Sequence, residues 1–234
     1  MGPTRRLARR FAGVTLIELL LVIAILGIVT AFAARVGREC LRVWDEQSRL
    51  MVANRALADA ARVVTRDLLG AMRVEGVAFE GEPQETNLED IVPIAVTLEK
   101  GQPKTRVAID RLAFATGHTR DPLGHPAGEA VEYTVARDEA GKLRGLVRRA
   151  AALDAAAQKE SPPVSEHIAE FRVEYLRKVG GRETWEKNWR AADGLPAAVR
   201  VTLGAWVGDA SGVSLQRLTT MVTIRATEEA RVPR

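Results

Sequence analysis

The stretch RRLARRFAGVTLIELLLVIAILGIVTAFAA, from Arg5 to Ala34, decides the fold of this chain. It consists of a basic leader without acidic residues, which ends at Gly13, and an apolar run from Val14 to Ala34. At about 1.5 Å of rise per helical residue, the run would be about 31 Å long, close to the thickness of the hydrocarbon core of a bilayer. We therefore expect a transmembrane helix over 14–34.

The charges beside this helix predict its orientation. Arg5, Arg6, Arg9 and Arg10 all precede the apolar run, and basic flanks remain on the cytoplasmic side. The roughly 200 residues that follow should then lie outside the cytoplasm. A plain signal anchor would also explain the apolar length, and Ala31-Phe32-Ala33 offers a cleavage site for an ordinary signal peptide.

Neither of these alternatives has a use for Glu18, the one charge inside the apolar run. A carboxylate inside a membrane helix costs on the order of 3 kcal/mol to insert, so it indicates a function. If the chain were cut after Gly13, the new amine of Val14 and the carboxylate of Glu18 would lie near one helix end. A neighbouring copy, shifted along the axis, could then pair its amine with this carboxylate.

The basic leader, Gly13 and the sequence VTLIELLLVIAILGIV resemble the processing motif of type IV pilins and type II secretion pseudopilins. The resemblance implies that a membrane peptidase cuts after Gly13 and methylates Val14, and that Glu18 acts in filament assembly. Val14 departs from the family, which usually has phenylalanine or methionine at this position.

The composition argues against a nucleic-acid partner. The chain has 34 basic and 30 acidic residues, but four of the arginines precede Gly13, so a processed chain would carry 30 of each. Its formal side-chain charge is then zero, and the basic character belongs to membrane topology. Cys40 is the only cysteine, which excludes an intramolecular disulfide, and we expect it to be a small residue on a helix face.

After the membrane run, the pattern predicts a stalk helix followed by strands. Leu50, Leu57, Ala61, Val64, Leu68 and Met72 form one apolar stripe at helical spacing up to about Val74, without an intervening proline. We expect a loop over 76–87 and another over 117–128. The expected strands are 91–98, 106–115, 130–137, 143–149, 168–176, 199–206 and 215–226, with a hairpin at DEAGK. The predicted fold is α+β and pilin-like: a long N-terminal helix packed on an antiparallel β head.

The C-terminal half resembles a narrower group. IAEFRVEYLRKVGGRETWEKNW followed by GLPAAVRVTLGAW is similar to the J-type minor pseudopilin of type II secretion, and TRDLLGAM and LVRRA also resemble it. Trp185 and Trp189 could be core residues that cap the sheet or stalk, or an exposed aromatic patch at a subunit interface. The residues that match this group are Phe171, Tyr175, Trp185, Trp189, Leu195, Pro196, Val199 and Val201.

No motif for catalysis, a cofactor or a metal is present in the sequence. The chain contains no G-x-S-x-G, P-loop or G-x-G-x-x-G motif. His118 and His125 share a predicted loop with Asp121, but their spacing fits no standard zinc site, and Glu129 adds no calcium-loop pattern. Ser161, Ser165 and His167 are close in sequence, yet nothing orients them as nucleophile and base. We therefore expect no enzyme, no metal and no cofactor.

The sequence as a whole predicts a minor pseudopilin in the inner membrane, with a cytoplasmic N-terminus and a periplasmic head. The resemblance implies a tip complex with I- and K-type subunits, contact with the major G-type subunit, and dependence on the prepilin peptidase/methyltransferase and the inner-membrane secretion platform. A minor type IV pilin, a DNA-uptake pseudopilin and a secreted binding domain or hydrolase are alternatives. The expected segments are a leader (1–13), a transmembrane helix (14–34), a stalk helix (35–75), a β head (76–226) and a polar tail (227–234).

Overall fold

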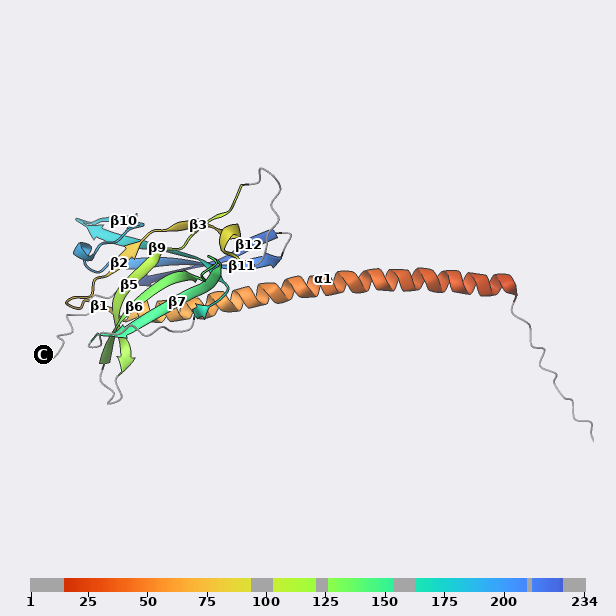
Figure 1. The fold of residues 1–234 in the computed structure, drawn as a ribbon, viewed down its shortest axis with the longest axis horizontal. Coiled ribbons are helices and arrows are strands. Elements are labelled where there is room, and N and C mark those ends of the chain that lie inside the picture. The colour runs from red at the N-terminus through yellow and green to blue at the C-terminus, as the bar shows by residue number, and fades with distance from the viewer. Residues whose placement is uncertain (1–14, 94–102, 121–125, 154–162, 210–211, 225–234) are drawn as a thin grey trace, which may run out of the picture. The chain divides into compact units, whose positions relative to one another are not determined.

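The computed structural model describes residues 15–93, 103–120, 126–153, 163–209 and 212–224 (Figure 1). The chain divides into two compact units, Met1–Ser48 and Arg49–Arg234. A single helix, α1 (Leu16–Leu69), makes up the described structure of the first unit after Thr15 and ends in the second. The second unit, which we call the head unit, also contains all of the described strands.

The C-terminal part of α1 is an amphipathic helix. Ala53, Leu57, Ala60, Val64 and Leu68 are buried, and their spacing of three or four residues places them on one face. The predicted stripe is therefore confirmed in the head unit. The predicted end of the helix near residue 74 is wrong, because α1 ends at Leu69.

A glycine ends the helix. The N–H of Gly70 donates to the carbonyls of Arg66 and Asp67, and the chain then turns into a two-residue strand, β1 (Ala71–Met72), which pairs with β5 (Arg111–Arg120). Met72, which the sequence pattern assigned to the helical stripe, therefore belongs to the sheet. Periodicity does not separate the last helical turn from the first strand residues, because both bury apolar side chains in the same core.

Two antiparallel sheets form most of the head unit. The first sheet has the order β1-β5-β6-β7-β8, and β2 also pairs with β5; the second has the order β10-β9-β11-β12. A short pair, β3 with β4, stands beside them. The remaining bounds are β2 (Glu80–Glu82), β3 (Glu85–Asn87), α2 (Leu88–Ile91), β4 (Arg106–Ala108), β6 (Pro126–Arg137), β7 (Leu143–Ala152), β8 (Pro163–Ser165), β9 (Ile168–Val179), β10 (Arg182–Glu186), η1 (Ala191–Asp193), β11 (Ala198–Asp209) and β12 (Gly212–Thr223).

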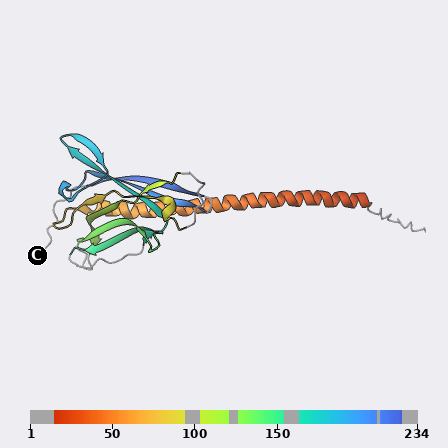
Figure 2. The ribbon, with the colours of Figure 1, turned by 45° about the horizontal axis from the view of Figure 1, so that its top comes forward.

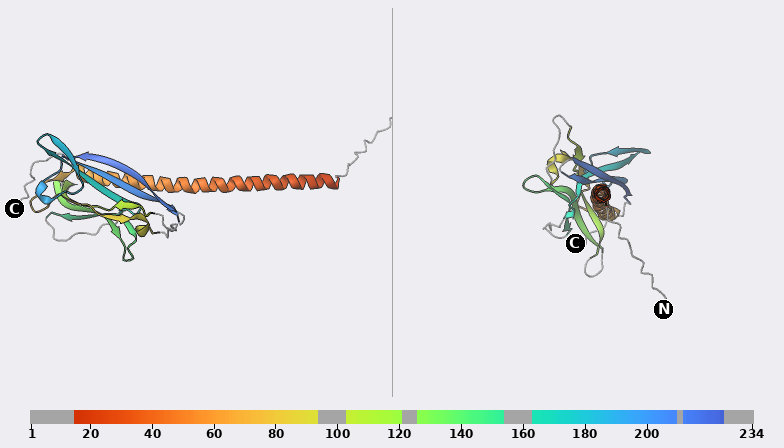
Figure 3. Two further views of the ribbon diagram at one scale, coloured as in Figure 1. Left: turned by 90° about the horizontal axis from the view of Figure 1, so that it is seen from above. Right: turned by 90° about the vertical axis from the view of Figure 1, so that its right-hand side faces the viewer.

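The C-terminal part of α1 lies in the angle between the two sheets, as Figures 2 and 3 show from different sides. Its buried face and the inner faces of both sheets form one hydrophobic core. Aromatic rings fill the centre of this core: Phe79 stacks on Phe114 with ring centroids 5.4 Å apart, and Tyr133 contacts Phe171 at 6.2 Å. The α+β architecture, with a long helix packed on antiparallel sheets, is thus confirmed.

Two backbone contacts join the sheets beyond the core. Gly81 on β2 and Trp189 exchange both of their backbone hydrogen bonds, at 2.9 and 3.0 Å. Asp110, which follows β4, donates its N–H to the carbonyl of Phe171 at 2.8 Å. Its buried carboxylate accepts the N–H groups of Val173 and Gln84 at 2.8 and 3.1 Å. Asp110 therefore satisfies backbone groups in the part of β9 that does not pair with β10.

Several predicted boundaries need correction. The Val/Ile-rich run predicted as a strand over 91–98 begins in helix α2, and 94–98 lie outside the described residues. The predicted loop over 76–87 contains β2 and β3, and the predicted loop over 117–128 contains the ends of β5 and β6. Strand β10 was not predicted, because its composition, RETWE, is dominated by charge.

The Asp110→Asn variant tests the contact of Asp110 with β9 through the pH dependence of stability. Burial, partly offset by the two backbone hydrogen bonds, raises the pKa of Asp110 above 3.8. The stability that this group contributes is then greatest below pH 3.8 and is lost as pH rises through the folded-state pKa. The unfolding free energy of wild type minus that of Asp110→Asn should therefore fall over this range and then stay constant, as measured by urea unfolding at several pH values. A difference that rises with pH would contradict the prediction.

Candidate functional site

The N-terminal end of α1 carries the predicted assembly glutamate. Glu18 lies in the first turn, and its N–H donates to the carbonyl of Thr15 at 3.1 Å and approaches the Thr15 hydroxyl at 3.3 Å. The Glu18 side chain is exposed. The predicted cleavage residue Gly13 and the predicted methylated residue Val14 lie outside the described residues. Their roles remain predictions.

The surface around Glu18 is apolar and uncovered. From Leu16 to Phe32, each large apolar side chain is at least half exposed. The described part of the chain contains one helix long and apolar enough to cross a membrane, with a mean hydropathy of 2.7 in its most apolar window and no buried residue there. Side chains of this kind need a cover that this chain, taken alone, does not supply. Lipid and neighbouring helices can both supply it.

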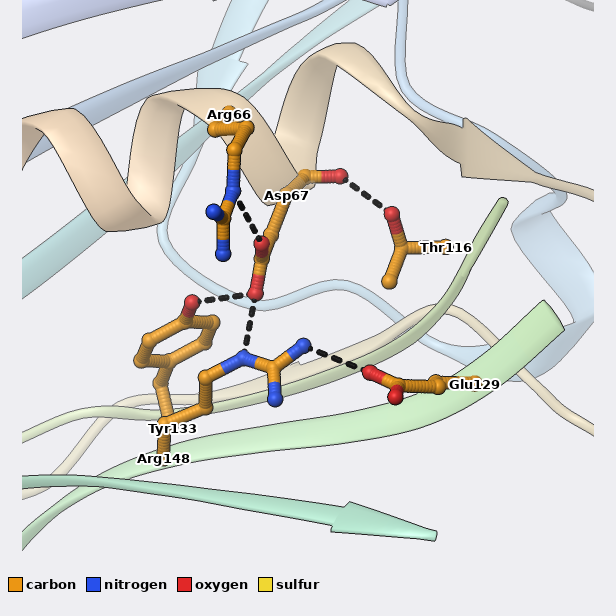
Figure 4. Close-up of polar contacts among 6 residues, drawn as sticks. All are labelled: Arg66, Asp67, Thr116, Glu129, Tyr133 and Arg148. Atoms are coloured by element: carbon orange, nitrogen blue, oxygen red, sulfur yellow. Dashed lines mark hydrogen bonds and ion pairs between the residues drawn. The ribbon is translucent and has the colours of Figure 1, made fainter. Parts of the chain in front are cut away.

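The other end of α1 is held in the head unit by a buried ionic cluster, which we call the Asp67 cluster (Figure 4). Asp67 is fully buried. Its Oδ2 accepts hydrogen bonds from the Tyr133 hydroxyl at 2.5 Å and from Arg148 Nε at 2.6 Å. The Nη2 of Arg148 reaches Glu129 Oε2 at 2.8 Å, and the Thr116 hydroxyl donates to the Asp67 carbonyl at 2.9 Å. The cluster thus joins α1 to β5, β6 and β7.

The surroundings of Tyr133 and Arg148 raise the pKa of each. Burial first, and then the Asp67 carboxylate, raise the pKa of Tyr133 well above its ordinary value. Burial acts to lower the pKa of Arg148, but the hydrogen bonds to Glu129 and Asp67 outweigh it and raise that pKa. The phenol therefore stays protonated and the guanidinium stays charged. The hydrogen bonds and ion pairs of the cluster hold the C-terminal end of α1 against the first sheet.

The two predicted interface tryptophans have different surroundings. Trp189 is only 3% exposed, its indole N–H donates to the Gly194 carbonyl at 2.7 Å, and the Arg177 guanidinium lies 4.6 Å from its ring centroid. It packs in the core, as one of the two predicted alternatives had it. Trp185 is half-buried, with Arg200 4.0 Å from its ring centroid. A role for Trp185 at an interface stays a prediction.

Among the residues considered for metal binding, Glu129 alone has a described side chain, and Asp121 and His125 lie outside the described residues. Glu129 is engaged by Arg148, and His167 lies against the ring of Trp206, with centroids 5.7 Å apart. His118 lies at the end of β5, and neither its side chain nor that of His125 is described. Among the described residues, no group of three His, Cys, Asp or Glu side chains could hold a metal ion. Cys40 is exposed on α1.

Comparisons with known proteins give the family. A family model described as type II secretion system, protein J, matches residues 43–208, and one described as the prokaryotic N-terminal methylation motif matches residues 8–34. A solved structure, a type IV-like pilin from Thermus thermophilus, is similar with a TM-score of 0.47 and 16% identity, over 73% of this chain and 95% of that one. No curated protein matches the chain.

A long apolar N-terminal helix with a prepilin-type methylation motif and an antiparallel β head defines a pilin-like, membrane-anchored subunit. Because the protein J model covers well over half of its length, this chain belongs to the type II secretion protein J family. It is a minor pseudopilin, a structural subunit of a type II secretion system.

Sequence reasoning did not find the Asp67 cluster. Asp67 and Arg148 lie in TRDLLGAM and LVRRA, the two segments that resemble J-type pseudopilins, but they are 81 positions apart and no pattern predicted their contact. One signal was available: Asp67 adjoins Leu68 on the face of the helix that the apolar stripe buries. A carboxylate in that position requires a buried cation or donors.

The Arg148→Met variant tests the cluster. Removal of the guanidinium leaves the Asp67 carboxylate buried without its main partner, which should lower the unfolding free energy of the head unit by about 3 kcal/mol. Urea denaturation of the full chain in detergent, followed by tryptophan fluorescence, measures the change. The neighbouring variant Arg149→Met is the control, because Arg149 is 40% exposed and meets Glu132 only at 3.9 Å. Equal effects of the two variants would contradict the assigned role.

Proposed function

We propose that this pseudopilin is cut after Gly13, methylated at Val14 and assembled through Glu18 into the tip of a pseudopilus. Support comes from one observation above all: Glu18 is an exposed carboxylate in the first turn of α1 and the only charge in the apolar run over 14–34. In this reading residues 1–13 are the leader and 14–34 cross the membrane.

The pairing of Glu18 explains how assembly could be specific in a lipid environment. A carboxylate and an ammonium group are each costly in hydrocarbon, and a close pair reduces the cost of both. The amine of Val14 on an adjacent subunit would be the natural cation, because cleavage creates it at the start of the same apolar helix. Packing of exposed apolar residues gives affinity, while the charge pair fixes the axial shift between subunits.

The proposed topology places the N-terminus in the cytoplasm and the head unit in the periplasm. The four arginines of the leader support this orientation. The proposed partners are I- and K-type subunits in the tip, the major G-type subunit below them, the prepilin peptidase/methyltransferase and the inner-membrane platform. The function proposed is packing, without catalytic turnover and without nucleic-acid binding.

Processing of the N-terminus can be tested on the native protein. Protein purified from its native membrane should begin at Val14 and carry one N-methyl group, because peptidase cleavage after Gly13 exposes that amine. Intact mass and N-terminal sequencing measure both. A chain that begins at Ala34 would instead indicate ordinary secretion and would contradict the proposal.

Substitution of Glu18 tests its role in assembly. The Glu18→Ala variant should insert into the membrane as well as wild type, because it removes a charge from an apolar helix, but its incorporation should fall at least tenfold. Cofractionation with the other pseudopilins after membrane solubilisation measures incorporation. Glu39→Ala is the matched control, since Glu39 is an exposed glutamate on the same helix beyond the apolar run. Normal incorporation of Glu18→Ala would refute the assembly role.

A further inference from the structure

Among the described residues, no strand pairs with the outer edge of strand β12. In the second sheet β12 is the last strand and pairs with β11 alone, through twelve consecutive residue pairs from Ala198↔Thr223 to Asp209↔Gly212. The pairing shows no register shift over its whole length. An edge of this kind presents a row of backbone N–H and C=O groups to solvent, which is a template for another strand.

The strands at the other edges of the two main sheets, within the described parts of the chain, are short. At the opposite edge of the second sheet, β10 has five residues, and its Glu183 is paired with Lys178 at 2.7 Å. In the first sheet, β8 has three residues and begins with Pro163, which cannot donate a hydrogen bond. Strand β2, also three residues long, is joined to Trp189. Strand β12 is twelve residues long, contains no proline, and has no strand on its outer side among the described residues.

Apolar side chains flank the free edge on both faces of the sheet. Leu218 is the register partner of buried Leu203, so it lies on the core face, yet it is 38% exposed. Met221 is the partner of Arg200, lies on the outer face and is 61% exposed. A strand added beside β12 would cover both side chains at once, and each would contribute hydrophobic stabilisation.

The charge on β12 restricts what can pair with it. Arg217 is the only charged residue of the strand, and its side chain is half exposed. Its Nε binds Glu170 on β9 at 2.5 Å, which is possible because Gly204 stands between them on β11: a Cβ at that position would come within 2.9 Å of Glu170 Oε2. Arg172 contacts the same carboxylate at 3.3 Å. Arg217 therefore shares the one carboxylate of Glu170 with Arg172, so this carboxylate does not balance both positive charges.

We propose that β12 is a docking strand: its free edge pairs with an extended strand of a neighbouring pseudopilin that carries an acidic side chain next to Arg217. This inference rests on the proposed function, which brings other pseudopilin heads beside this one. Backbone hydrogen bonds supply affinity, and Leu218, Met221 and Arg217 supply register. A second copy of this chain fits less well, because β12 has no acidic residue to place beside Arg217.

Hydrogen exchange tests the pairing directly. The full chain in detergent would be compared alone and after reconstitution with the I-, K- and G-type pseudopilins of its own machinery. Every second amide of residues 212–223 should exchange at least tenfold more slowly in the assembly, because alternate N–H groups of an edge strand face the open side. Unchanged exchange over 212–223 in an assembled sample would overturn the inference.

Photo-crosslinking identifies the occupant. A photoreactive residue at Thr219 or Met221 should crosslink to another pseudopilin, and the same residue at Val179, which is 65% exposed at the end of β9, should not. The Met221→Lys variant should reduce the Thr219 crosslink at least tenfold, whereas Val179→Lys should leave it unchanged. Crosslinks only to a second copy of this chain would overturn the proposed occupant. If the subunits assemble but the amides of β12 are not protected from exchange, this inference alone is wrong. If Glu18→Ala assembles normally, the proposed function is wrong.

Discussion

The structure of the head unit depends on one charged contact, between Asp67 on α1 and Arg148 on β7. A carboxylate without solvent exposure is tolerated only where a cation and hydrogen-bond donors surround it, and here Arg148 and Tyr133 both point at the same oxygen. Rotation or sliding of the helix would separate the Asp67 carboxylate from the two partners on the first sheet that compensate for its burial. The apolar face of α1 provides most of the stabilisation, and the Asp67 cluster selects one register from those that packing alone would permit.

The same helix has opposite requirements at its two ends. In the head unit, Ala53, Ala60 and Ala61 are small enough to bring α1 close to the strands, and both sheets cover them. Toward the N-terminus the side chains are larger, more apolar and exposed. The exposed apolar side chains from Leu16 to Phe32 need a cover, which lipid and neighbouring helices can supply. Incomplete burial of this kind is stable in a protein that functions as a structural subunit of an assembly.

The sequence was sufficient for the long helix, its apolar stripe and the antiparallel sheets, because each depends on local periodicity. The predicted end of the helix was wrong, because the apolar stripe continues past Leu69 into β1 without a change in hydrophobicity. Strand β10 was missed because it is rich in charge, and ion pairs to β9 stabilise it. Sequence reasoning also missed the contact of Asp67 with Arg148, because only the fold brings those positions together. The sequence left Trp189 as either core or interface, and its backbone pairs with Gly81, a residue far away in the chain that no local pattern connects to it.

Glu18 and the edge of β12 are both unsatisfied in the isolated subunit, but they differ in physical kind. In the proposed assembly, Glu18 is the one charge of the apolar run over 14–34 and would fix a single axial position. The β12 edge is a row of backbone groups whose pairing tolerates many side chains and is limited mainly by Arg217 and by the apolar flanks. If one helix contact alone joined subunits, the heads could rotate about it. A second contact of a different kind, in the head, would remove that freedom, and this is a physical reason for a minor subunit to keep a long strand edge unprotected.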